Sequence, residues 1–337
     1  MEDELSFDKW GLYNQNQRLS YRLFLAQELA NTRLNRFYVD KSKNSFKPSL
    51  NIFSRLKISD SLSHSDFIFV PHPWISIKNN SSYRNYLYKL SKTTPLLISN
   101  DDDISPKCDL PNTLQFRSSL HPRENPFRKI ILPYMANHQP FKERNWKPVP
   151  QVSFMGFVPK FGLGSLTSKS SSFLHSPIKS SVYLNRKISV NKLRKLDKNF
   201  KVTVVERDTF TLLTNNPNLD LHRREFRENL LESDYVLCPR GFGNFSIRLY
   251  ETLSSGATPI LINSGKNLPE LEDNTFWSSN IITLELFSDW QKIIQEDWES
   301  LKLGNAYANR QIQNREMFIQ ELDVQKYSEK IFSNYLK

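Results

Sequence analysis

Residues 233–262, which run SDYVLCPRGFGNFSIRLYETLSSGATPILI, decide the fold prediction for this chain. The apolar run from Tyr235 to Cys238 predicts a buried strand, and Pro239 ends it because proline cannot donate to a strand ladder. A helix is predicted over residues 246–255, and a second apolar strand over residues 258–262. A strand, a loop, a helix and a returning strand in so few residues form a compact β-α-β unit with parallel strands.

The loop and helix start of this unit have the residue types of an anion site. Ser246 is a typical N-cap, whose hydroxyl can accept a hydrogen bond from the first turn, and Gly256 suits the left-handed position after the helix. Free amides at a helix N-terminus favour an anion, glycines let the backbone approach it, and guanidinium groups match diphosphate oxygens. Glu251, one turn after Arg248, can direct a carboxylate toward ribose hydroxyls. The residues expected to bind a nucleotide are Arg240, Gly241, Gly243, Asn244, Ser246, Arg248 and Glu251.

Spacing alone leaves a second interpretation open. A strand, a glycine loop and a helix also occur as plain structural units, with Arg240 and Arg248 paired to surface acids. The stretch matches neither GxGxxG nor GxxxxGK[ST], which argues against dinucleotide oxidoreductases and P-loop kinases.

The same alternation of strands and helices continues along the chain and predicts an α/β fold with parallel sheets. The 337 residues suit two domains of about 150 residues each. We expect an acceptor-side domain over 1–150, a nucleotide-binding domain over 151–310, and a C-terminal helix over 311–337 that packs back across them. A serine-rich stretch, 162–181, is predicted to be a mobile loop, either a linker or a lid. Other strands are predicted over 66–71, 95–99, 113–116, 129–132, 152–155 and 201–205, and helices over 19–34, 83–90, 222–232 and 311–336.

The composition narrows the classes of protein. Apolar residues make up 38% of the chain, so it is not disordered as a whole. The net charge of +11 is spread along the sequence, which fits a soluble surface or a phosphate-binding cleft and disfavours a nucleic-acid arm. Cys108 and Cys238 give neither a disulfide framework nor a zinc spacing. The start, MEDELSFDKW, is not a secretory signal, and no apolar run reaches the roughly 20 residues of a transmembrane helix. We expect a cytoplasmic protein, with peripheral membrane contact allowed; a removed anchor would leave the same pattern.

The motif resembles the signature of exostosin-family (GT47-type) glycosyltransferases, which combine a CPRG loop, S-x-R-L and G-x-x-P. Here these are Cys238–Gly241, Ser246–Leu249 and Gly256–Pro259. Weaker matches follow the family order between about residues 65 and 300, among them Ser65–Pro71, Ile131–Tyr134, Phe154–Gly156, Leu268–Pro269 and Trp277. The spacer Phe242–Phe245 is the chain's own. Eukaryotic members are typically membrane-anchored, whereas we expect no anchor from this sequence.

The resemblance implies a GT-B architecture, in which two Rossmann-like domains face each other across a cleft. It also implies inverting transfer of a sugar from a nucleotide sugar, usually a UDP-sugar, to a glycan or other hydroxyl acceptor. No metal and no other cofactor is expected, because arginines and a helix dipole replace the cation. Alternatives are a GT-B fucosyltransferase using GDP-fucose and a non-catalytic protein that binds an anionic polymer.

An inverting transferase needs a base to accept the proton of the acceptor hydroxyl. Asp102 lies in the run Asp101–Asp103 after a predicted strand, and His72 follows another, with Trp74 offering a surface for sugar stacking. The aspartate run also contains a DxD pattern, which would suit a metal-dependent GT-A enzyme, or it is a solvated helix-capping turn. His72 can equally be a turn residue without a role.

Overall fold

The structure is a computed structural model, and its chain divides into two compact units. Unit 1 comprises residues 1–133, 267–269 and 324–337, and unit 2 comprises residues 134–266 and 270–323. The predicted boundary at residue 150 therefore lies inside unit 2. The structure describes residues 10–14, 22–25, 56–58, 67–70, 74–78, 80–99, 107–117, 120, 128–133, 136, 138–158, 177–207, 218–241, 244–262, 268–323, 326–327 and 330.

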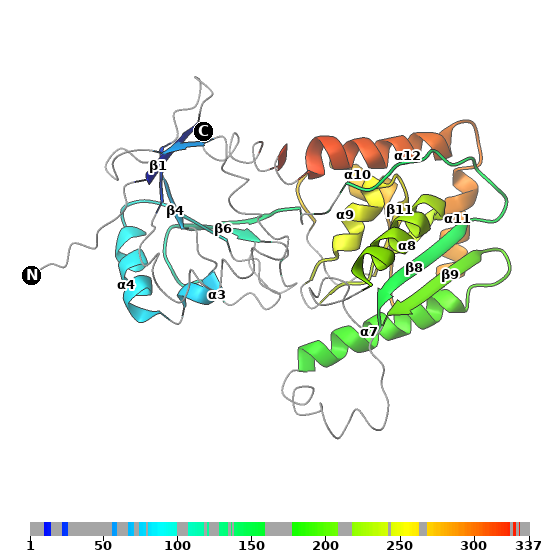
Figure 1. Ribbon diagram of the computed structural model, residues 1–337, viewed down its shortest axis with the longest axis horizontal. Helices are drawn as coiled ribbons and strands as arrows, with labels where there is room; N and C mark the ends of the chain where they lie inside the picture. The colour runs from blue at the N-terminus through cyan, green and yellow to red at the C-terminus, as the bar shows by residue number, and fades with distance from the viewer. Residues whose placement is uncertain are drawn as a thin grey trace, which may run out of the picture. The chain divides into compact units, whose positions relative to one another are not determined.

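Unit 2 is built on a five-stranded sheet in which every neighbouring pair is parallel (Figure 1). This confirms the parallel β-α-β unit predicted from residues 233–262. The strand order is β12-β11-β10-β8-β9. The strands are β8 (Gln151–Phe157), β9 (Lys201–Arg207), β10 (Tyr235–Leu237), β11 (Thr258–Ile262) and β12 (Ile282–Leu284).

The strand order creates a switch point between β8 and β10. After β8 the chain runs to one side, to β9, and then returns to the other side, to β10. Connections leaving β8 and β10 at their carboxyl ends therefore diverge, and this is where open α/β sheets bind ligands. The loop predicted to bind an anion follows β10 at this point.

Helices cover both faces of this sheet. Val152 and Phe154 pack in one core cluster with α7 (Pro177–Arg194) and α11 (Trp290–Ser300). Ser153 points to the opposite face, because successive side chains of a strand alternate, and its hydroxyl donates to Asn229 of α8 (Leu219–Glu232) at 3.0 Å. The central strands β8, β10 and β11 are thus buried on both sides, which explains their largely apolar sequence, whereas the edge strand β9 is only partly buried.

Several elements of unit 2 differ from the predictions. Helix α7 begins at Pro177, inside the stretch predicted as a serine-rich loop, whose residues 162–176 lie outside the described part. Its buried positions Val182, Arg186, Val190 and Leu193 recur at helical spacing, a signal hidden by the serine density before it. The C-terminal helix begins earlier than predicted, as α12 (Ala306–Met317), and continues as the π-helical turn η2 (Phe318–Leu322). Elements without a prediction are β12, α11 and α10 (Phe276–Asn280).

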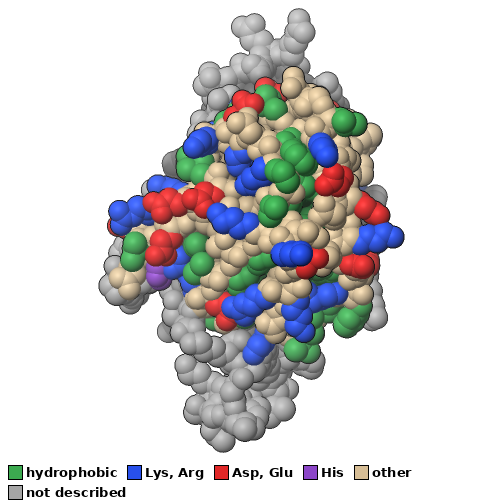
Figure 2. All heavy atoms as spheres, turned by 90° about the vertical axis from the view of Figure 1, so that its right-hand side faces the viewer, with side chains coloured by type: hydrophobic (Ala, Val, Ile, Leu, Met, Phe, Trp, Pro, Cys, Tyr) green, Lys and Arg blue, Asp and Glu red, His purple; other side chains and the backbone are tan. Residues whose placement is uncertain are grey.

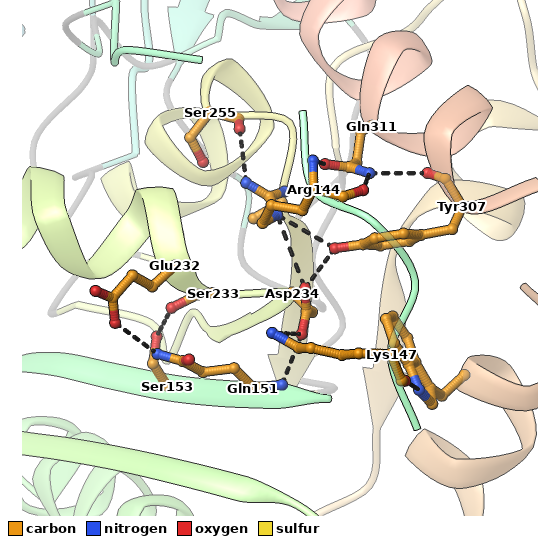
Figure 3. Close-up of polar contacts among 12 residues, drawn as sticks. Arg144, Lys147, Gln151, Ser153, Glu232, Ser233, Asp234, Ser255, Tyr307 and Gln311 are labelled. Carbon is orange, nitrogen blue, oxygen red and sulfur yellow. Dashed lines mark hydrogen bonds and ion pairs between the residues drawn. The ribbon is translucent and has the colours of Figure 1, made fainter. Parts of the chain in front are cut away.

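A buried polar network fixes the opposite, amino end of the sheet (Figure 3). Asp234, just before β10, accepts a hydrogen bond from the Gln151 backbone N–H at 2.7 Å and from the Tyr307 hydroxyl of α12. The Lys147 Nζ lies 3.1 Å from the same carboxylate, and the Arg144 Nε lies 3.8 Å away. Arg144 also exchanges two hydrogen bonds with the Gln311 side chain. The network therefore attaches the incoming segment and α12 to the base of β10.

Unit 1 contains a seven-stranded sheet in the order β3-β1-β2-β4-β5-β6-β7. From β2 to β7 the neighbours are parallel, as predicted, whereas β1 is antiparallel to both β2 and β3. The helix predicted over 19–34 is wrong at β2, where pairing with β1 and β4 overrides the helical spacing of the apolar residues. The strands are β1 (Trp10–Asn14), β2 (Arg22–Leu25), β3 (Leu56–Ile58), β4 (Phe67–Val70), β5 (Leu96–Ser99), β6 (Thr113–Arg117) and β7 (Lys129–Ile131).

The core of unit 1 lies between these strands and two helices, α3 (Trp74–Ile77) and α4 (Ser81–Leu90). Helix α4 starts two residues before the predicted range of 83–90, because the Asn80 side chain caps it, accepting a hydrogen bond from the Tyr83 N–H at 3.0 Å. Trp74 is 1% exposed, and its indole N–H donates to the Lys107 carbonyl. The prediction that Trp74 offers a sugar-stacking surface is therefore wrong.

The surface shows no single block of charge on the face drawn in Figure 2, where Lys and Arg alternate with Asp and Glu. On this face the mixed charge does not form a continuous track of one sign for a polyanion. None of the helices in the described part of the chain combines the length and apolar character that a membrane crossing demands.

Candidate functional site

Two backbone hydrogen bonds anchor the loop after β10, one to the neighbouring strand β11 and one within the loop. The Cys238 N–H donates to the Ile260 carbonyl at 2.8 Å, and the Gly241 N–H donates to the Phe245 carbonyl at 2.9 Å. The Cys238 thiol is fully buried and contacts the Val236 carbonyl and the Thr252 hydroxyl. Cys238 is thus a packing residue, and the loop leads directly into α9 (Ile247–Ser254).

Both ends of α9 lie close to their predicted positions. Ser246 occupies the N-cap with an extended backbone, but its hydroxyl makes no capping hydrogen bond, so that part of the prediction is wrong. Gly256 has a φ of +74°, which confirms the left-handed residue expected after the helix. A Cβ at Gly256 would also lie 2.6 Å from the Phe141 ring, so close packing reinforces the need for glycine.

Arg248, in the first turn of α9, is the central cation of the site. Its guanidinium carbon lies 5.1 Å from the ring centre of Phe154 and 5.9 Å from that of Phe226. Its buried Nε has no hydrogen-bond partner, and the guanidinium forms no hydrogen bond or ion pair with any residue in the described ranges. Burial lowers the pKa of Arg248. The charge of the nearby Glu251 carboxyl opposes this shift, but no carboxylate of the described residues lies at ion-pair distance. A desolvated guanidinium packed against ring faces can therefore direct its N–H groups toward a bound anion.

Gly156, near the end of β8, makes room for this guanidinium. A Cβ placed there would lie 2.0 Å from Arg248 Nη2 and 2.9 Å from Cζ. Glycine is therefore the residue that lets Arg248 lie against the strand. This contact gives a physical reason for Phe154-Met155-Gly156, since Phe154 contacts the guanidinium face and Gly156 leaves space for its edge.

Two further arginines, Arg207 and Arg186, lie near Arg248, and no sequence motif pointed to either of them. Arg207, at the end of β9, is buried and paired with Glu225 of α8, its Nη2 lying 2.7 Å from the carboxylate. Arg186 of α7 is buried as well and donates to backbone carbonyls of both loops at the switch point. They were missed because neither lies near the motif, and basic residues are frequent throughout the chain.

Besides Arg248, the two other ionisable residues predicted to bind a nucleotide, Arg240 and Glu251, also have shifted pKa values. Burial lowers the pKa of Arg240, which is partly exposed in the loop. Burial raises the pKa of Glu251 to about 7, and the nearby Arg248 opposes that shift. The Glu251 carboxyl makes no hydrogen bond or ion pair with another residue of the described ranges, so it can accept hydrogen bonds from a ligand, or donate them, at neutral pH.

The structure gathers most of the predicted nucleotide-binding residues in one place, around the carboxyl ends of β8 and β10. Asn244 is buried beside them, at 5% exposed. Gly243, His72 and Asp102, together with the whole Asp101–Asp103 run, lie outside the described residues. Within the described ranges, no group of three or more His, Cys, Asp or Glu side chains could hold a metal ion.

Comparisons with known proteins give structural likeness only. No protein-family model matches the sequence, and a search of curated proteins finds no match either. The C-terminal domain of LpcC, a glycosyl transferase group 1 family protein from Francisella tularensis, aligns with 51% of this chain and 86% of its own length, at 15% identity and a TM-score of 0.25. WaaG, a glycosyltransferase involved in lipopolysaccharide biosynthesis, aligns with 80% of this chain and 75% of its own length, at 14% identity and a TM-score of 0.36. MurG from Acinetobacter baumannii aligns with 80% of this chain and 74% of its own length, at 9% identity and a TM-score of 0.35. These values are too low to carry an assignment, which rests on the chain's own residues.

Proposed function

We propose that this protein is a glycosyltransferase of GT-B architecture whose unit 2 binds a nucleotide sugar at the carboxyl ends of β8 and β10. The observation that carries the proposal is Arg248, a buried cation between Phe154 and Phe226 and beside Gly156, which forms no ion pair or hydrogen bond with any residue that the structure describes. It lies at the switch point of a parallel sheet and in the first turn of a helix, where phosphate groups bind. The exostosin-like motif gives the same assignment from the sequence.

The proposed roles follow from the chemistry of a departing nucleoside diphosphate. Arg248 and Arg240 neutralise the charge that grows on the diphosphate as the glycosidic bond to it breaks. Glu251 binds ribose hydroxyls, which suits a carboxyl whose pKa is about 7. Since the arginines supply the positive charge, transfer is metal-independent, and UDP is the proposed nucleotide.

The acceptor side of the reaction belongs to unit 1 in this proposal. A base there accepts the proton of a glycan or other hydroxyl as its oxygen attacks the sugar, with inversion at the anomeric carbon. Asp102 is the first candidate for this base, and His72 is the second.

Calorimetry with UDP tests the donor site directly. We expect Arg240→Ala and Arg248→Ala each to weaken UDP binding about tenfold or more, because each removes a charge-assisted hydrogen bond. Arg194→Ala is the matched control, since Arg194 is an exposed arginine of unit 2 paired with Glu206. Unchanged UDP affinity in both site variants would refute the proposed cradle.

A thermal-shift series with UDP-, GDP- and dTDP-sugars identifies the donor, because a ligand that binds only the folded state raises the melting temperature. Stabilisation by UDP-sugars supports the proposal. Stabilisation by GDP-fucose alone would favour the fucosyltransferase instead. Salt-dependent binding of polyanions without any nucleotide effect would favour a polymer-binding protein.

A further inference from the structure

We infer that Arg186 of α7 is a positioning residue that sets the conformation of the nucleotide-binding loop, an inference that rests on the proposed function. Its Nη1 donates to the Phe157 carbonyl at the end of β8, at 3.1 Å. Its Nη2 donates to the Arg240 carbonyl at 2.8 Å and reaches the Pro239 carbonyl at 3.4 Å. One guanidinium therefore joins the two chain segments that diverge at the switch point.

The contact to two consecutive carbonyls fixes two peptide planes. In a trans peptide the C=O and the following N–H point in opposite directions. With the Pro239 and Arg240 carbonyls turned toward Arg186, the N–H groups of Arg240 and Gly241 must point away from it. The Gly241 N–H does so, donating to the Phe245 carbonyl at 2.9 Å. Arg186 thus determines which side of the loop presents amides.

Arg186 also adds positive charge without bringing a counter-ion. It is 6% exposed, pairs with no carboxylate among the described residues, and has a buried Nε without a partner. Burial, assisted by the neighbouring Arg248, lowers the pKa of Arg186 to about 9, so the group is still charged at neutral pH. A guanidinium without a described carboxylate partner, beside Arg248, increases the attraction of the site for a diphosphate.

Lysine cannot replace this arrangement. The guanidinium presents two nitrogens in a rigid plane, one to each segment, whereas an ammonium offers a single point of contact on a flexible stem. Arg186→Lys should therefore preserve the charge and lose the bridge, which separates positioning from electrostatics.

The first test is hydrogen exchange of the unliganded protein, followed in peptides covering residues 237–250. We expect exchange there to be faster in Arg186→Ala and Arg186→Lys than in the wild type, and unchanged in the control Arg194→Ala on the same helix. Unchanged exchange in both Arg186 variants would overturn the inference, whatever the protein binds. If Arg186→Ala lacks a cooperative melting transition, Arg186→Lys carries the test.

The second test is UDP calorimetry with chemical rescue. We expect UDP affinity to fall about tenfold or more in Arg186→Ala and to recover in part when free guanidinium ion at low millimolar concentration fills the vacated site. A loss that guanidinium does not relieve would show that Arg186 acts through general stability and would overturn the inference. Failure of the wild type to bind UDP, GDP or dTDP would instead refute the proposed function. Hydrogen exchange of residues 237–250 would still test the role of Arg186 in that case.

Discussion

Replacing Gly156 with alanine tests whether Arg248 binds the donor from the position seen here. The new Cβ would lie 2.0 Å from Arg248 Nη2 and 2.9 Å from Cζ, distances that no real contact tolerates. The obstacle is the end of a flexible side chain, so the guanidinium is expected to swing out from between Phe154 and Phe226. The diphosphate then loses its principal cation although Arg248 is still present.

The expected magnitude follows from the interaction that is lost. A hydrogen bond to a charged group contributes about 1.5–3 kcal/mol, which corresponds to an increase in the UDP Kd of about 10- to 150-fold. Gly156 also has a φ of +156°, where an L-residue is strained by about 1–3 kcal/mol, so a lower free energy of unfolding is expected as well. Affinity must therefore be measured where both proteins are fully folded.

A double-mutant cycle separates the two effects. UDP affinity is measured by calorimetry in the wild type, Gly156→Ala, Arg248→Ala and the double variant. If alanine at 156 acts by displacing the guanidinium, it should cost almost nothing once Arg248 is gone. If Gly156→Ala lowers UDP affinity equally with and without Arg248, the reasoning is refuted, because the effect then comes from the backbone. If Gly156→Ala lowers UDP affinity in neither case, Arg248 does not hold the diphosphate from this position.

Three other predictions concern pH, stability and metal. Because the pKa of Glu251 is raised from 4.5 to about 7, the folded state binds its proton more tightly than the unfolded chain. The free energy of unfolding, measured by urea titration, should therefore fall as pH rises from 4.5 through about 7. Glu251→Gln should make this fall shallower. The same pH dependence in Glu251→Gln as in the wild type would contradict the raised pKa of Glu251. Asp234→Asn should lower the free energy of unfolding by about 3 kcal/mol, since it leaves Lys147 and Arg144 beside a neutral group, while the control Asp220→Asn, at an exposed pair with Arg223, should change it little. EDTA should leave sugar transfer intact, and loss of activity restored by Mn²⁺ would assign a metal role to Asp101–Asp103.

The sequence by itself determined the local features of unit 2. Pro239 after an apolar run, Ser246 before a helix and Gly256 after it are properties of single residues and their immediate neighbours, and they located β10, α9 and β11 within a residue or two. The same reasoning found β4 to β9, whose short apolar runs need no distant information. It failed at Arg22–Leu25, where strand pairing decided the conformation, and at α7, where serine-rich sequence hid the helix.

Only the tertiary structure decided how the site is assembled. Gly156, Arg186, Arg207 and Arg248 come from four elements, and their nearness depends on the order in which β9, β8 and β10 lie in the sheet. The predicted cations Arg240 and Arg248 differ in their surroundings for the same reason, since the rings beside Arg248 come from β8 and α8. The sequence motif from Cys238 to Pro259 identifies residue types that can bind a diphosphate. Which guanidinium is buried between aromatic rings depends on packing between segments far apart in sequence, because burial and pairing are set by the neighbours that the fold brings to each charge.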